Sequence, residues 1–146
     1  MKKKGEKVPP YLENISKDIM IDRKIKIFIE KPLFLVGRDY LNPPSDLVLG
    51  GRDVQARQAE IKTINGKVFV VSIGYHVYVN GLRLIPEQPQ ELAHLDRVVF
   101  GWNSVFLYKN KDPNIPIPEK YQGKYIDWWF VKSELIKLVD IDESDS

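Results

Sequence analysis

The stretch AEIKTINGKVFVVSI, residues 59–73, decides the fold because two strand-forming runs flank an Asn-Gly pair. β-Branched and aromatic residues are frequent in both runs, and such residues favour extended chain on a pleated, half-buried surface. Asn65-Gly66 is the strongest short-range signal of a two-residue β-hairpin turn, since both residues tolerate a positive φ. The stretch therefore predicts two antiparallel strands joined by a tight turn.

Two further turns of this kind follow along the chain. Asn80-Gly81 lies between VYV and LRL, and GWN, residues 101–103, lies between RVVF and SVFLY. Short strands with turn residues at this spacing are typical of an all-β fold, a two-sheet antiparallel β-sandwich. The sequence predicts this sandwich over residues 9–109, with upstream strands at residues 24–29, 33–36 and 47–49.

After the last predicted strand the sequence changes character. Residues 110–125 contain three prolines and predict an extended linker, because proline cannot occupy a central strand. Residues 126–139 predict an amphipathic helix with Asp127 as its N-cap. Trp129 and Ile136 are expected to remain available to a partner. The face expected to dock on the sandwich consists of Trp128, Val131, Leu135 and Leu138.

The composition fits one globular domain. The chain has 146 residues, of which 43% are hydrophobic, and it contains no cysteine, which excludes disulfide and thiolate chemistry. Residues 1–8 form a basic tail and residues 140–146 an acidic tail, while the net charge is only +2. This weak, dispersed charge does not predict nucleic-acid binding. No apolar run reaches the ~18 residues of a membrane span or follows the N-terminus as in a signal peptide, so neither membrane insertion nor secretion is expected.

Residues suited to catalysis do not form a recognisable constellation. The two histidines, His76 and His94, lack metal-ligand spacing to each other or to a cysteine. The sequence contains neither a P-loop nor a G-x-S-x-G nucleophile elbow. Carboxylate pairs such as Glu87 and Glu91 lie in a polar segment, where solvated charges are the usual outcome. We therefore expect no enzyme activity, no cofactor and no metal site in this chain.

Three short motifs resemble those of the forkhead-associated (FHA) domain family. Gly37-Arg38 follows a predicted strand, and Asn80-Gly81 closes a later one. LAHLDRVVFG, residues 92–101, is similar to the family's Leu-x-x-Gly-Asp-x-Ile-x-x-Gly, with leucine where the first glycine is usual. The resemblance implies an FHA/SMAD-like β-sandwich whose loops at one end bind phosphothreonine peptides. It also implies structural turn roles for Gly37, Asn80 and Gly81.

A closer resemblance is to the FHA region of kinesin-like cargo motors. It rests on PYLENI at residues 10–15, GWNSVF at residues 101–106 and DWWFVKSEL at residues 127–135, the last of which lies outside the FHA core. The resemblance covers residues 9–140 and implies a cytoplasmic, cytoskeleton-associated setting. It further implies either a part of a kinesin-like protein, in which a motor domain elsewhere engages microtubules and ATP, or a free-standing relative of that region.

The positions that read phosphate in this family are only partly kept. Arg38 matches the family's arginine, but Gln55 and Gln58 stand at the serine and histidine of the Ser-x-x-His turn, and Tyr75 stands at the asparagine before the Asn-Gly turn. Phosphothreonine carries about two negative charges and three acceptor oxygens, so a reader needs several converging donors. We expect Arg38, Gln55 and Tyr75 at one end of the sandwich. The candidate binding residues are Arg38, Arg52, Gln55, Arg57, Gly74 and Tyr75.

These observations favour a non-catalytic interaction module that docks a partner protein or a neighbouring coiled coil with little dependence on phosphothreonine. One alternative is a genuine phosphothreonine-peptide reader, binding a phosphoprotein through Arg38 and substitute donors. Another is an architectural component of a cytoskeletal assembly. Arg38 itself is either such a phosphate donor or a loop arginine paired with Asp39 or Asp53. Phosphate dependence of binding distinguishes the first two functions. Stoichiometric, salt-resistant incorporation of the protein into a cytoskeletal assembly identifies the third.

Overall fold

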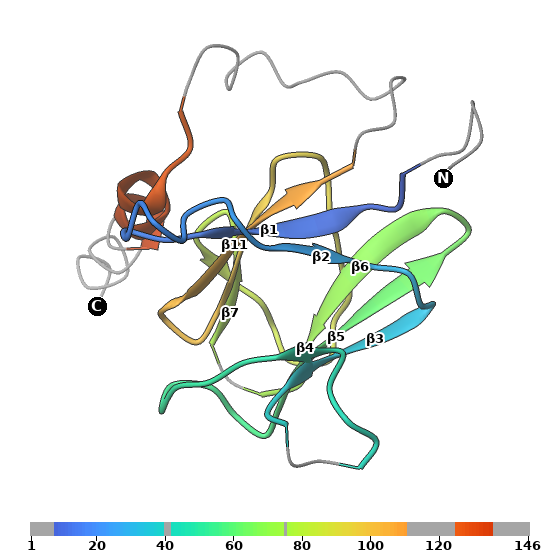
Figure 1. Cartoon of the computed structure of the whole chain (residues 1–146). Coiled ribbons are helices and arrows are strands. Elements are labelled where there is room, and N and C mark those ends of the chain that lie inside the picture. Colours follow the sequence, from blue (N-terminus) through green and yellow to red (C-terminus); the bar gives the residue numbers. More distant parts are fainter. Residues whose placement is uncertain (1–7, 40–41, 75, 111–124, 136–146) are drawn as a thin grey trace, which may run out of the picture.

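The computed structural model of the chain describes residues 8–39, 42–74, 76–110 and 125–135. Two β-sheets lie face to face, and a helix lies beside one of them (Figure 1). Most of the predicted linker, both tails and Tyr75 fall outside the described residues. The prediction of a two-sheet β-sandwich with a C-terminal helix is confirmed. Within the described ranges, no helix is long and apolar enough to span a bilayer.

The sheets have six and five strands, and all neighbouring strands pair antiparallel except β3 and β4. Sheet A, in the order β2-β1-β11-β10-β7-β8, consists of β1 (Tyr11–Ile15), β2 (Lys26–Phe28), β7 (Val77–Val79), β8 (Leu82–Arg83), β10 (Arg97–Phe100) and β11 (Ser104–Lys109). Sheet B, in the order β4-β3-β5-β6-β9, consists of β3 (Leu33–Gly37), β4 (Leu47–Val48), β5 (Arg57–Ile64), β6 (Lys67–Ser72) and β9 (Gln90–Glu91).

The hairpin turns lie where the sequence places them. Asn65 and Gly66 join β5 to β6 with φ angles of 52° and 78°, and Asn80 and Gly81 join β7 to β8 with φ angles of 54° and 84°. Both pairs occupy the left-handed region, which asparagine and glycine tolerate better than other residues. The two turns thereby set the register of their hairpins.

Two strands differ from expectation. The entry segment PYLENI contributes β1, which lies between β2 and β11 and pairs antiparallel with both. In this pairing Tyr11 lies opposite Lys109, a partner so distant along the chain that no local pattern contains it. The polar segment around Glu91 also contains a short strand, β9, which pairs with β6. Long-range pairing, rather than strand propensity, creates these two elements.

Sheet A is apolar on both faces. Its strands β10 and β11 are almost continuously buried, as is expected for strands that are covered on both sides. Alternate residues of the two strands therefore belong to different clusters. The core between the sheets receives Val98, Phe100, Phe106 and Tyr108, whereas the outer face of sheet A carries Val99, Val105 and Leu107.

The helix, residues 128–135, covers this outer face of sheet A. Val131 and Leu135 are 0% and 2% exposed and belong to the same apolar cluster as Val99 and Leu107. Asp127 caps the helix, because its carboxylate accepts a hydrogen bond of 2.9 Å from the Phe130 amide. The helix is thus attached by an apolar stripe at helical spacing.

The two tryptophans of the helix have different environments. Trp128 is half-buried against the apolar cluster, whereas Trp129 is 69% exposed. Leu138 and Ile136, the other positions that the sequence assigns to docking and to a partner, lie outside the described residues. The outer surface of the helix therefore carries a large apolar side chain.

A bidentate ion pair adds to this attachment. The Arg97 guanidinium, on β10, donates from Nε and Nη2 to the two carboxylate oxygens of Glu134 at 2.9 and 2.5 Å. Arg97 is only 3% exposed and also lies 5.4 Å from the ring centroid of Phe130. A buried charge of this kind is tolerated because its partner and its hydrogen bonds are both present. Glu134 thus fixes the rotation of the helix on the sheet.

We expect Leu135→Ala to lower the free energy of unfolding by about 2–5 kcal/mol, because it removes a side chain buried between the helix and sheet A. Trp129→Ala is the matched control and should change the free energy by no more than about 0.5 kcal/mol, since most of Trp129 is in solvent. Urea denaturation of both variants measures the difference. Equal midpoints would show that the helix contributes nothing to the stability of the sandwich.

Gly37 is expected to resist substitution. A Cβ atom at this position would lie 2.2 Å from the Ala56 carbonyl oxygen, where β3 and the start of β5 approach each other. We predict that Gly37→Ala lowers the free energy of unfolding by about 1–3 kcal/mol, as overpacking does. Gly50→Ala is the control, because nothing lies within 4 Å of its Cβ position. Thermal unfolding of the pair would contradict the prediction if Gly37→Ala melted no earlier than Gly50→Ala.

Candidate functional site

Arg38 begins the loop that follows β3 and binds the backbone of a second loop. Its Nε donates to the Val54 carbonyl at 3.0 Å, and its Nη2 donates to the Gly51 carbonyl at 2.8 Å. No carboxylate of the described residues lies within ion-pair distance of Arg38, so neither Asp39 nor Asp53 is its partner. The guanidinium of Arg38 therefore holds residues 49–56, the β4–β5 loop, in place.

Gln55 and Gly74 meet at the same end of the sandwich. Gln55 is exposed on the β4–β5 loop, and Gly74 follows β6. A Cβ atom at position 74 would lie 2.7 Å from Gln55 Oε1, so the glycine allows the two loops to approach. Tyr75 lies outside the described residues, and its predicted position beside Arg38 stays a prediction.

Gln58 connects these two loops from inside. It is fully buried, its Oε1 accepts a hydrogen bond of 2.7 Å from the Gln55 amide, and its Nε2 donates to the His76 carbonyl at 3.4 Å. Its backbone carbonyl also accepts the amides of Ile73 and Gly74 at 3.1 and 2.9 Å. The sequence identified Gln58 only as the place of a missing histidine. The sequence feature of such a bridge is a glutamine at the start of a strand, and its burial in the structure identifies its role.

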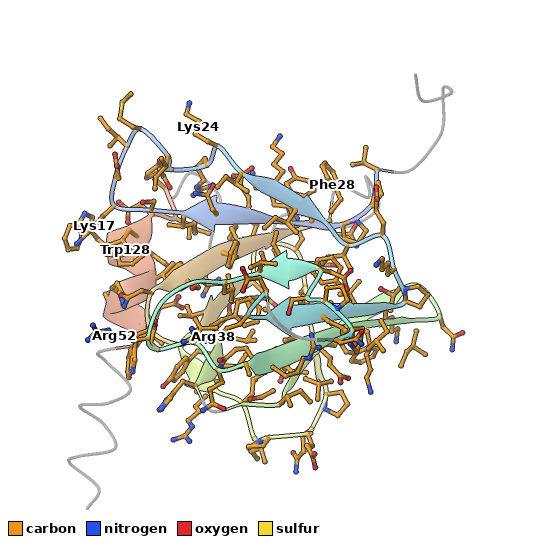
Figure 2. The ribbon with its side chains drawn as sticks, turned by 60° about the horizontal axis from the view of Figure 1, so that its bottom comes forward. Lys17, Lys24, Phe28, Arg38, Arg52 and Trp128 are labelled. Atoms are coloured by element: carbon orange, nitrogen blue, oxygen red, sulfur yellow. The ribbon has the colours of Figure 1, made fainter. Side chains whose placement is uncertain are left out.

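The two other arginines of the candidate set differ in their contacts. Arg57 donates to Ser45 Oγ at 3.2 Å and to the Pro43 carbonyl at 2.6 Å, so it fixes the β3–β4 loop. Ser45 Oγ in turn donates to the Arg38 carbonyl at 2.8 Å. Arg52 is exposed on the β4–β5 loop, and Figure 2 shows it together with Arg38. Arg57 is therefore bound within the protein, while Arg52 faces solvent.

Asp53 attaches the β4–β5 loop to the turn between β10 and β11. One carboxylate oxygen accepts the amides of Trp102 and Asn103 at 2.7 and 3.1 Å. Burial alone would raise the pKa of Asp53, but these amide hydrogen bonds and the positive charge of Lys132 outweigh it and lower the pKa. The carboxylate is thus negatively charged at neutral pH and holds the turn in its ionised form.

The candidate peptide face, defined here as Arg38, Arg52, Gln55, Arg57 and Gly74, therefore has part of its donor capacity engaged within the protein. Two of its three arginines are already hydrogen-bonded to backbone carbonyls. Arg52 and the Gln55 side chain are exposed on its surface. No group of three or more His, Cys, Asp or Glu residues in the described ranges is arranged to bind a metal.

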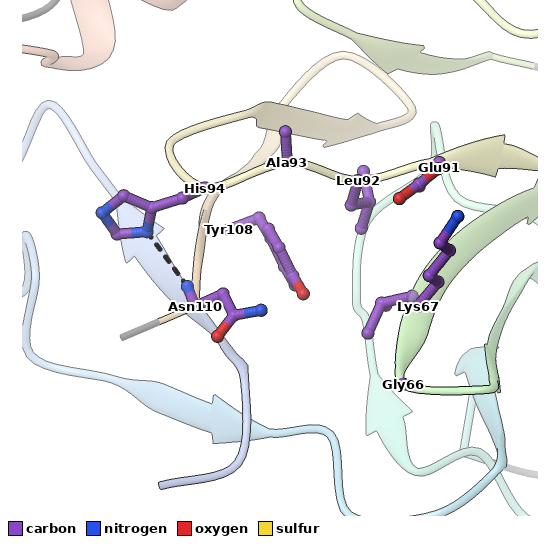
Figure 3. Close-up of a pocket in the computed structure, with 9 residues that line it drawn as sticks. Gly66, Lys67, Glu91, Leu92, Ala93, His94, Tyr108 and Asn110 are labelled. Atoms are coloured by element: carbon purple, nitrogen blue, oxygen red, sulfur yellow. Dashed lines mark hydrogen bonds between the residues drawn. The ribbon is translucent and has the colours of Figure 1, made fainter. Parts of the chain in front are cut away.

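A separate cavity of about 220 Å³ lies near the β5–β6 turn, at the other end of the eight-residue strand β5 (Figure 3). Its lining includes Tyr108, His94 and Asn110, and the Asn110 amide donates to His94 Nδ1 at 3.0 Å. Burial raises the pKa of Tyr108 to about 12, so its hydroxyl is neutral. None of the candidate binding residues lines this cavity.

Comparison with protein families identifies one domain. Residues 34–101 match the model of the FHA domain. The chain is also 33% identical over 103 residues to kinesin-like protein KIF28 of Rattus norvegicus and 32% identical to that of Mus musculus. Each match covers 70% of this chain but spans only about a tenth of the length of the relative.

Solved structures support the same fold. The MEK1 FHA domain superposes with a TM-score of 0.59 at 18% identity, covering 71% of this chain and 91% of that domain. The yeast Dun1 FHA domain, determined in complex with a doubly phosphorylated peptide, gives a TM-score of 0.57 at 20% identity, covering 82% of this chain and 86% of that one. The family match at residues 34–101 shows that the chain belongs to the FHA domain family, a family of non-catalytic interaction modules, and the KIF28 relatives show that it has kinesin-like homologues.

Proposed function

We propose that this FHA domain binds a partner protein with little dependence on phosphothreonine, as one part of a kinesin-like protein. The proposal rests on one observation, the hydrogen bonds that the Arg38 side chain makes within the protein. Its fork, the matched phosphate donor of the family, is directed at the carbonyls of Gly51 and Val54. These bonds engage the Nε–Nη2 edge of the guanidinium, so a phosphate could use only the remaining N–H groups, chiefly those of Nη1, unless it displaced them.

Two further positions that the resemblance connects with phosphate reading, Gln55 and Gln58, support the same proposal. Gln55 and Gln58 stand where the resemblance places a serine and a histidine, and Gln58 is fully buried as a bridge. A charge-assisted hydrogen bond contributes about 1.5–3 kcal/mol. The loss of two such bonds would weaken a phosphopeptide complex by about two orders of magnitude or more. Arg52 and Gln55 remain to bind peptide backbone or acidic side chains.

The partner is proposed to be a protein, and two features favour a partner helix or coiled coil beside the domain. Trp129 is 69% exposed on the helix that covers sheet A, and tryptophan is one of the residue types enriched at protein–protein interfaces. The relatives are kinesin-like proteins of which this chain spans about a tenth, so we propose that a motor domain lies in another part of the parent protein. In this proposal the domain reaches microtubules and the cytoskeleton only through that motor.

A phosphothreonine reader with substitute donors is the second candidate. Arg52 favours it, because this exposed arginine lies on the loop that Arg38 holds and can approach a phosphate at the candidate peptide face. The two candidates differ in a single measurable quantity, the ratio of the affinities for phosphorylated and unphosphorylated forms of the same peptide.

We expect this ratio to stay below about tenfold, or about 1.4 kcal/mol, in calorimetric titrations with paired peptide libraries. Arg52→Ala should reduce binding of acidic and phosphorylated peptides alike, whereas Lys67→Ala, an exposed lysine on β6, should change neither. Arg38→Lys keeps a positive charge but removes the guanidinium, so it tests whether charge alone at this position supports a preference for phosphate. Micromolar phosphate-dependent binding that Arg38→Ala abolishes without a lower melting temperature would contradict the proposal and establish the reader.

A further inference from the structure

We propose that the C-terminal helix positions the β4–β5 loop of the candidate peptide face, through a chain of contacts from Lys132 to the β10–β11 turn and from that turn to Asp53. The helix would then be part of the binding site's support as well as a cover for sheet A. The positioning itself needs no ligand, and only its effect on peptide affinity rests on the function proposed above.

The first contact joins the helix to the turn. Lys132 Nζ donates to the Trp102 carbonyl and, at 3.3 Å, to Asn103 Oδ1. The same ammonium lies 4.9 Å from the ring centroid of Trp128 and 5.9 Å from that of Trp102. Cation–π contacts of this kind are attractive within about 6 Å. Lys132 is therefore held between the helix and the turn by both hydrogen bonds and aromatic faces.

The second contact joins the turn to the β4–β5 loop. The amides of Trp102 and Asn103 point to Asp53, while the Trp102 carbonyl points to Lys132, so the turn is held from two sides. Gly101 makes this close fit possible, because it has a φ of +69° and its Cβ position lies 2.6 Å from Asp53 Oδ2. The turn cannot shift without moving one of these two charged side chains.

The third contact reaches the candidate peptide face itself. Asp53 lies between the two residues whose carbonyls accept the Arg38 guanidinium, Gly51 and Val54. A change in the position of Asp53 therefore changes the two acceptors that direct Arg38. The exposed Arg52 precedes Asp53 directly, so the freely available cation of the face depends on the same anchor.

This arrangement links the two surfaces of the protein. Trp129 is exposed on the same helix that Lys132 attaches to the turn, and the two residues are neighbours at i and i+3. A partner that draws the helix away from sheet A would release the turn and then the β4–β5 loop. Because linkage between binding events is reciprocal, a ligand that orders the loop would also strengthen the attachment of the helix.

The test measures amide hydrogen exchange of the full chain by mass spectrometry. Lys132→Met keeps an unbranched side chain against Trp128 but removes the donors, and we expect it to speed exchange within residues 49–56 by about tenfold, since local opening sets the exchange rate. Residues 59–73 serve as the internal reference and should not change. Lys24→Met, which alters an exposed lysine of the β1–β2 loop, is the matched control and should leave both segments unchanged.

Asp53→Ala and the double variant complete the test. If the contacts act as one unit, the double variant should exchange within residues 49–56 no faster than Asp53→Ala alone, because non-additivity is the mark of coupled residues. Unchanged exchange of residues 49–56 in Lys132→Met, or fully additive effects in the double variant, would overturn the proposal. If Lys132→Met speeds exchange within residues 49–56 but the unchanged protein binds no peptide, the positioning by the helix is supported and the proposed function is rejected.

Discussion

The burial of sheet A on both faces is the constraint on which the rest of the structure depends. One face closes the sandwich core, and the other would leave Val99, Val105 and Leu107 in water if the helix did not cover them. Burial of apolar area at about 25 cal/mol per Å² makes that cover a large contribution to stability. The buried Arg97 adds a second requirement, because it needs the Glu134 carboxylate. The helix is therefore a structural part of the domain, although it lies outside the matched residues 34–101.

The sequence predicted the elements whose cause is local. Asn65-Gly66 and Asn80-Gly81 predicted their turns because few other residue pairs accept two successive positive φ angles. The spacing of Val131 and Leu135 predicted a helix with one apolar face, and these two residues are buried. The pairing of β1 with β11 was not predictable in this way, because it joins residues about a hundred positions apart. Its cause is the shared core rather than any property of either segment.

In the candidate site, too, the sequence predicted some features, whereas others depend on contacts between distant parts of the chain. The family's motifs put Arg38, Gln55 and Gly74 in one candidate set, and the structure adds the contacts of Arg38 with the β4–β5 loop and of Gln55 with Gly74. They did not reveal that Arg38 would be directed at two backbone carbonyls, because that depends on the path of the loop. They also gave Gln58 no role, although it makes the closest link between the two loops. The sequence shows which side chains differ from the family motif, whereas the structure shows which backbone groups those side chains bind.

The amide of Gln58 has one more consequence, which concerns protons. The histidine that the family resemblance places at this position would exchange a proton near neutrality, and each protonation state would offer a different set of donors and acceptors. A glutamine offers one acceptor and one amino group at every physiological pH. The two hydrogen bonds of the Gln58 amide described above, from the Gln55 amide and to the His76 carbonyl, therefore join groups that keep the same protons at every physiological pH.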